Sequence, residues 1–179
     1  MITYLVLAGV SGLGKTTLRD NLIKLYPDYY QKAIQITTRK RRKNESYDSY
    51  IWLDEEQYKT IESTLIGCTY FNGNYYGTIP TYENKKTSVI ILNKEGLKDF
   101  LVKIKRLSDI YYFILGIDKP DEFLEMREGR TIEFLAKERE VLSLCDHVIK
   151  LKSNKYIINE DLHEITKFNF SKYFKIRKE

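Results

Sequence analysis

Short hydrophobic runs alternate with longer mixed stretches along the chain, and their spacing predicts alternating strands and helices. Runs with the composition of buried strands occur at residues 2–8, 33–36, 50–53, 89–92, 111–117 and 147–151. Apolar residues recur at helical spacing in two of the stretches between them, as Leu18, Leu22 and Leu25, and as Leu97, Phe100, Leu101, Ile104 and Leu107. Strands that alternate with helices favour an α/β fold with a parallel sheet core flanked by helices.

A segment rich in arginine and tyrosine, residues 34–79, interrupts this alternation. Within it, Asp54 and Gln57 have the spacing of a capping box and predict a helix over residues 55–64. An Asn-Gly pair among tyrosines predicts a hairpin-like segment over residues 68–77. We therefore predict that residues 34–79 form a small insertion in the core.

The last third of the chain is strongly charged. From Asp118 onward the sequence predicts a long charged helix, with Gly129 as its weakest point. Asn159 predicts the N-cap of a terminal helix.

Length and composition predict one domain with one sizeable core, because the chain has 179 residues and 42% hydrophobic content. The formal net charge of +5 suits an anionic small molecule as well as a nucleic acid. Two cysteines and two histidines provide neither a disulfide framework nor a metal-ligand cluster, so the expected compartment is a reducing cytoplasm. No hydrophobic run is long enough to cross a bilayer, and we expect no membrane association.

Residues 9–17, with the sequence GVSGLGKTT, match the phosphate-binding pattern G-x-x-x-x-G-K-[ST]. Glycines allow consecutive backbone N–H groups to surround a phosphate, Lys15 can reach the outer phosphates, and the Thr16 hydroxyl can coordinate Mg²⁺. A predicted strand precedes the loop and a predicted helix follows it, and a helix N-terminus favours anions. The candidate nucleotide-binding residues are Gly9, Ser11, Gly12, Gly14, Lys15, Thr16 and Thr17.

Three further stretches, all in segment 34–79, carry a resemblance to a known family. They are Thr37-Thr38-Arg39 with Arg42 and Glu45, then Tyr50-Ile51-Trp52, then the sequence GNYYGT from Gly73 to Thr78. With the phosphate loop, these stretches make the chain resemble the guanylate kinases over most of its length.

This resemblance implies a P-loop nucleoside monophosphate kinase fold in a single domain of residues 1–179. The implied parts are a core (1–33, 80–117 and 140–179), a nucleoside monophosphate (NMP)-binding insertion (34–79) and a short lid (118–139). The implied activity is ATP-dependent transfer of the γ-phosphoryl group to GMP, dGMP or a related nucleoside monophosphate, with ATP and Mg²⁺ as cofactors. The resemblance says nothing about oligomeric state.

By the same resemblance, Arg39, Arg42, Tyr50 and Tyr76 hold the acceptor phosphate. Their chemistry suits this role, because guanidinium groups match phosphate oxygens bidentately and tyrosine hydroxyls add donors. The alternative for the basic run 39–43 is a solvated loop or a nucleic-acid patch. The neighbouring tyrosines favour a phosphate pocket over nucleic acid as the partner.

The positions that read the base in guanylate kinases depart from the family pattern here. Gly67 stands where the family has a carboxylate, Gln35 replaces a serine, and Asn93 replaces an aspartate. Thr78 keeps a hydroxyl, and Glu62 is an alternative source of the missing carboxylate. The base preference therefore stays open between guanine and a base with one N–H and two carbonyls, such as uracil or thymine.

The lid contributes three candidate catalytic arginines, Arg127, Arg130 and Arg139, which would stabilise the transferred phosphoryl group together with Lys15. The alternative for each is a surface helix charge paired with Glu125, Glu133 or Glu138. Two other functions stay open: a non-catalytic binding module of the guanylate kinase type, and an ATPase or polynucleotide kinase that acts on nucleic acid.

Overall fold

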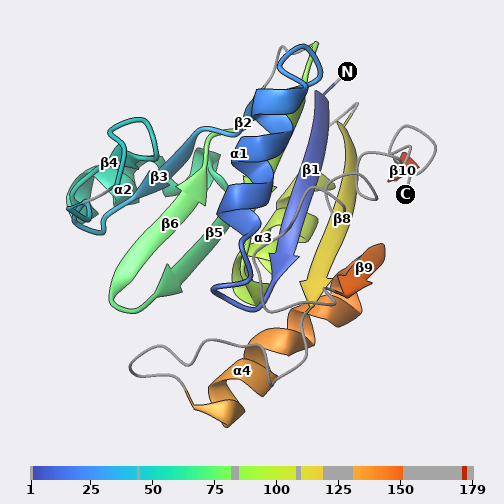
Figure 1. Ribbon diagram of the computed structural model, residues 1–179. Coiled ribbons are helices and arrows are strands. Elements are labelled where there is room, and N and C mark those ends of the chain that lie inside the picture. The colour runs from blue at the N-terminus through green and yellow to red at the C-terminus, as the bar shows by residue number, and fades with distance from the viewer. Residues whose placement is uncertain are drawn as a thin grey trace.

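A computed structural model describes residues 2–43, 45–81, 85–107, 110–118, 131–150 and 175–176. Figure 1 shows one sheet in the centre of the molecule and a second, smaller sheet beside it.

The central sheet is parallel apart from one short strand, as the sequence predicts. Its order is β10 (Lys175–Ile176), β8 (Ile110–Asp118), β1 (Ile2–Gly9), β7 (Thr87–Ile91) and β2 (Tyr30–Lys32), and β9 (His147–Lys150) also pairs with β8. Among the described strands of this sheet, only β10 runs antiparallel to its neighbour. The carboxyl ends of the parallel strands therefore meet at one edge, the usual place for a ligand in such sheets.

Helices cover both faces of the central sheet (Figure 1), because side chains alternate along β1. Leu5 and Leu7 pack with α1 (Lys15–Leu25) in one core cluster. Tyr4 and Val6 pack with α3 (Lys94–Ile104) in a second cluster on the opposite face. The helix α4 (Ile132–Arg139) continues as a 3₁₀ turn, Glu140–Leu144.

The smaller sheet has the order β4 (Ile51–Trp52), β3 (Gln35–Thr37), β6 (Asn74–Thr78) and β5 (Ile66–Phe71). The predicted hairpin is confirmed, because β5 and β6 pair antiparallel. The helix α2 (Glu55–Ile61) has the predicted capping box, with Asp54 and Gln57 each bonding the backbone of the other.

Several predicted boundaries are wrong. The predicted strand 33–36 begins too early, because residues 33 and 34 only connect β2 of the central sheet to β3 of the smaller sheet, which begins at Gln35. The predicted helix 55–64 ends at Ile61, and residues 62–64 form a 3₁₀ turn.

The predicted long helix from Asp118 is also wrong at its start. Asp118 belongs to β8, and the helix in the described residues begins at Ile132, where the Thr131 side chain accepts a hydrogen bond from the backbone of Phe134. Residues 119–130 and the predicted helix at Asn159 lie outside the described residues. A search of the described helices found none with the length and hydrophobicity that a membrane span requires.

Candidate active site

The phosphate loop connects the carboxyl end of β1 to the first turn of α1. Gly9 lies directly opposite Ile117 of β8, with φ of 135°, and only glycine fits there because a Cβ would lie 2.2 Å from the Ile117 carbonyl oxygen. Gly14 is the N-cap of α1, and Thr16 and Thr17 lie exposed in its first turn. The loop amides therefore precede a helix N-terminus, which favours anions.

Hydrogen bonds from Lys15 and Ser11 hold the loop in its present conformation. The Lys15 Nζ atom donates to the carbonyl oxygens of Gly9 at 2.8 Å and Val10 at 2.7 Å. The Ser11 backbone N–H donates to Glu138 Oε2 at 2.9 Å, which joins the loop to α4. The sequence indicates for Glu138 only a surface ion pair with an arginine of the lid. Nothing in the local pattern around Glu138 indicates its contact with Ser11, which lies 127 positions away.

A pocket of about 610 Å³ lies between the phosphate loop and the smaller sheet. It brings Thr16 together with the four residues that the resemblance assigns to the acceptor phosphate, Arg39, Arg42, Tyr50 and Tyr76. The loop and the basic segment thus face a common space, although 22 or more positions separate them in the sequence.

Glu45 holds the Arg39 side chain inside this pocket. Nη2 of Arg39 lies 2.8 Å and 2.9 Å from the two carboxylate oxygens, and both side chains are largely buried. Partial burial acts to raise the pKa of Glu45, but the hydrogen bonds and charges of Arg39 and Arg42 together lower the pKa below its ordinary value. Arg39 is thereby fixed before a phosphate arrives, which reduces the entropy lost on binding.

Aromatic rings form the wall beside Arg39. Its guanidinium lies 5.6 Å from the Tyr50 ring centre, and the Tyr50 ring contacts Trp52 and Tyr76 edge to face. Burial raises the pKa of Tyr50, so its hydroxyl stays protonated at neutral pH. It can therefore donate a hydrogen bond to an anion.

Arg19, which no sequence pattern singled out, also lines the pocket. Arg19 is only 6% exposed to solvent, and its Nη2 atom lies 2.7 Å from Asp20 Oδ1. Arg19 follows Thr16 by three positions on α1, so helical spacing alone could have placed both on the face towards the loop.

A smaller pocket of about 130 Å³ adjoins Tyr50 and Tyr76, and Gln35, Gly67 and Asn93 line it. The structure thus brings together three of the positions assigned to the base. The Thr78 hydroxyl is fully buried and has no hydrogen-bond partner among the described residues, and Thr78 pairs across the smaller sheet with Gln35.

Glu62 is not among the residues that line this smaller pocket. Its partly exposed carboxylate lies 3.8 Å from Lys59 Nζ, and it does not supply the missing acid here.

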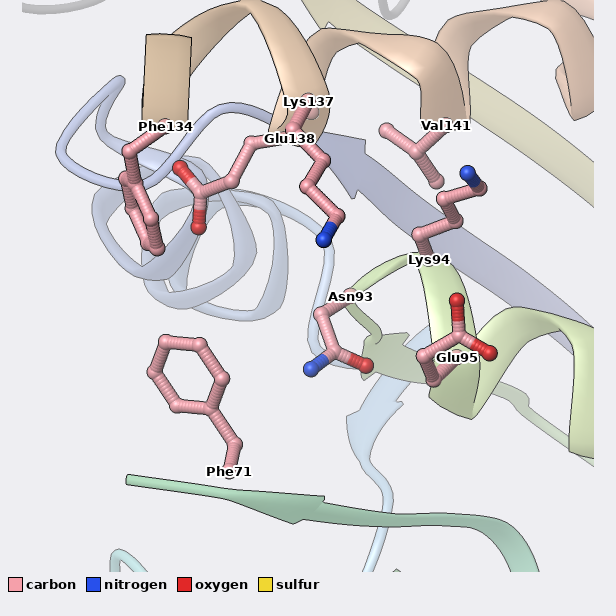
Figure 2. Close-up of a pocket in the computed structure, with 9 residues that line it drawn as sticks. Phe71, Asn93, Lys94, Glu95, Phe134, Lys137, Glu138 and Val141 are labelled. Atoms are coloured by element: carbon pink, nitrogen blue, oxygen red, sulfur yellow. The ribbon is translucent and has the colours of Figure 1, made fainter. Parts of the chain in front are cut away.

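A third pocket, shown in Figure 2, lies between α4 and the N-terminus of α3 and reaches Gly9. Arg139 Nε lies 2.9 Å from Asp118 Oδ1, and neither residue lines this pocket. Arg127 and Arg130 lie outside the described residues. Among the residues that the structure describes, no three His, Cys, Asp or Glu side chains gather as a metal site.

Comparisons with known proteins agree with this arrangement. A family model described as "Guanylate kinase" matches residues 1–168. The guanylate kinase of Chlamydia felis is 29% identical over 162 residues, which cover 86% of this chain and 78% of that protein. The guanylate kinase of Enterococcus faecalis is 33% identical over 122 residues, which cover 64% of this chain and 59% of that protein.

The crystal structure of guanylate kinase from Anaplasma phagocytophilum superposes with a TM-score of 0.71 and 20% identity. The match covers 98% of this chain and 88% of that one, and it shows a shared fold.

Proposed function

The chain belongs to the guanylate kinase family, and from this premise we propose that it transfers the γ-phosphoryl group of ATP to GMP or dGMP. One observation carries the proposal: Thr16 of the phosphate loop lines the same pocket as Arg39, Arg42, Tyr50 and Tyr76. Phosphoryl transfer needs a donor and an acceptor phosphate in line, and it needs charge neutralisation more than covalent chemistry.

The residues divide between the two phosphates. The amides of Gly12 and Gly14, with Lys15, would hold the β- and γ-phosphates of ATP. Lys15 would leave the carbonyl oxygens of Gly9 and Val10 to do so.

The four acceptor residues would hold the monophosphate, whose oxygen is already anionic and needs no general base. We also propose that Arg127, Arg130 or Arg139 stabilises the transferred group from the lid, residues 118–139. Closure of this lid and of the insertion, residues 34–79, over the core would exclude water from the reaction.

Mg²⁺ fits the donor set at the loop. The Thr16 hydroxyl is exposed and faces the pocket, and Mg²⁺ in such sites takes most of its ligands from phosphates and water. When bound, the ion would neutralise phosphate charge. Thr16 would supply the protein ligand.

The substitution Lys15→Ala tests the donor site. We expect kcat to fall by about 10³-fold, because a cation that stabilises the transferred charge is lost. Lys24→Ala is a matched control, since Lys24 is an exposed lysine in the last turn of the same helix. Circular dichroism should show that both variants fold, and full activity in Lys15→Ala would overturn the proposal.

A substrate panel separates this function from a binding module. ATP consumption is measured with each common ribonucleoside and deoxyribonucleoside monophosphate. We expect phosphorylation of at least one purine monophosphate, and no turnover with any of them would favour the binding module.

A further inference from the structure

The pocket beside Tyr50 and Tyr76 has an unusual polar lining for a site that binds a base. Its polar side chains besides the tyrosines are Gln35, Thr69 and Asn93, and the described residues that line it include no Asp or Glu. The orientation of the two amides therefore decides which base edge can be paired.

The Asn93 amide presents a donor to the pocket. Its Oδ1 accepts a hydrogen bond from the Gly96 backbone N–H at 2.8 Å and caps α3, and only an oxygen can do this. Its Nδ2 therefore points the other way, 3.3 Å from Thr69 Oγ1. Figure 2 shows the nitrogen turned towards Phe71 and the oxygen towards α3.

The Gln35 amide presents an acceptor. Its Nε2 donates to the carbonyl oxygen of Ile91 at 3.3 Å, and a carbonyl cannot pair with the amide oxygen. Gln35 is 9% exposed, so this orientation leaves Oε1 as the atom that can accept from a ligand. One side-chain amide thus offers an acceptor and the other a donor.

Gly67 also lines the pocket and has no side chain that could offer a carboxylate. Its φ is 64°, and an added Cβ would lie 2.8 Å from Leu92 Cδ2. A longer side chain at this position would need a strained backbone and a shift of Leu92.

We propose that this pocket, in the kinase proposed above, pairs with one ring N–H of a purine and leaves an amino group at C2 unpaired. Asn93 also lines the cavity beside Gly9, so it lies on the side of the base pocket nearer the phosphate loop. A monophosphate whose phosphate lies towards the loop would turn the sugar edge of its base, which carries C2 of a purine, to this side. The Gln35 oxygen would accept from N1–H, and Asn93 would direct a donor at C2.

Hypoxanthine and guanine differ only at this C2 position, where guanine has an amino group. Two donors that face each other cannot bond, and the amino group would lose its water without gaining a partner. The enzyme should therefore use IMP at least as efficiently as GMP.

The first experiment measures kcat/KM for GMP, IMP, UMP and CMP with saturating ATP, and the affinity of GMP and IMP without ATP. The expected result is IMP equal to or better than GMP in both measurements. A preference for GMP of more than about tenfold, or a preference for either pyrimidine over both purines, would overturn the proposal. Equal binding of GMP and IMP without turnover of any nucleotide would overturn the proposed kinase function, but it would support the proposed base recognition by this pocket.

The second experiment uses Asn93→Asp. Aspartate caps a helix as well as asparagine does, and its second oxygen replaces Nδ2 as an acceptor. The ratio of kcat/KM for GMP to that for IMP should rise by about 10- to 100-fold, as for a hydrogen bond to a charged group.

The matched control is Gln57→Glu, which adds the same charge on the exposed side of α2 and keeps its capping box. An unchanged ratio in Asn93→Asp, in a variant that melts cooperatively, would overturn the role of Asn93. A rise in Gln57→Glu as well would show a general charge effect and would overturn it too.

Discussion

Replacement of Gly9 with alanine tests whether the phosphate loop depends on the close approach of two strands. Gly9 ends β1 opposite Ile117 of β8. A Cβ would lie 2.2 Å from the Ile117 carbonyl oxygen, and real Cβ contacts essentially never fall below 3.0 Å. The oxygen would have to move by about 1 Å in a close-packed sheet. The substitution therefore strains both strands.

The expected cost has two parts. The backbone conformation at φ of 135° disfavours a side chain by about 1–2 kcal/mol. Disturbance of one or two hydrogen bonds between β1 and β8 adds about 1–2 kcal/mol. We expect Gly9→Ala to lower the free energy of unfolding by about 3 kcal/mol in total, and to raise KM for ATP because the loop begins there.

Urea unfolding followed by circular dichroism measures this loss. Gly73→Ala is the matched control, because Gly73 also has a positive φ, of 75°, but a Cβ there would meet no atom within 4 Å. The control should lose only about 1 kcal/mol from backbone strain. Equal losses in the two variants would refute the steric argument.

Three further predictions follow from the pocket and the cysteines. Arg39→Lys keeps the charge but loses the planar guanidinium that can bind a phosphate with two hydrogen bonds. KM for the monophosphate should therefore rise by about tenfold, while the thermal unfolding midpoint stays within a few degrees. An unchanged KM would contradict the role of Arg39 in binding the acceptor phosphate. Glu45→Gln should lower the free energy of unfolding most above pH 4.5, the ordinary pKa of a glutamate. This loss should shrink as the pH falls through the lowered pKa of Glu45, because the native carboxylate is then protonated too. Denaturant titrations at several pH values measure the loss, and a loss independent of pH would count against this role of the carboxylate. Burial raises the pKa of Cys145 to about 12, and it also raises the pKa of Cys68. Iodoacetamide at about pH 8 should therefore label both thiols more slowly than in an unfolded control, as measured by mass spectrometry. Labelling as fast as in the control would contradict this expectation.

The features that the sequence predicted correctly are local. The strand, glycine loop and helix of residues 2–25 follow one another directly, and so do the capping box at Asp54 and the hairpin turn before Asn74. Short-range spacing and turn chemistry suffice for such elements. The assignment of Arg39 and Tyr76 to one phosphate stays a prediction, and the common pocket supports it.

The features that the sequence did not reveal depend on distant partners. Tyr30 to Lys32 have no strong strand pattern, and they form a strand because β7 offers a free edge. The contact of Ser11 with Glu138 joins residues 127 positions apart. Asn93 precedes a helix with regular apolar spacing, which could have indicated its capping role.

The sequence by itself determined the phosphate loop, the alternation of strands and helices, and the residue types in the acceptor segment, because each depends on neighbours a few positions away. Only the tertiary structure decided that the loop and the acceptor segment face one pocket. It also decided which amide atoms of Asn93 and Gln35 are available to a ligand in the smaller pocket. The physical reason is that the direction of an amide depends on the groups packed around it, here a helix N-terminus and a strand carbonyl, and these come together only when the chain has folded.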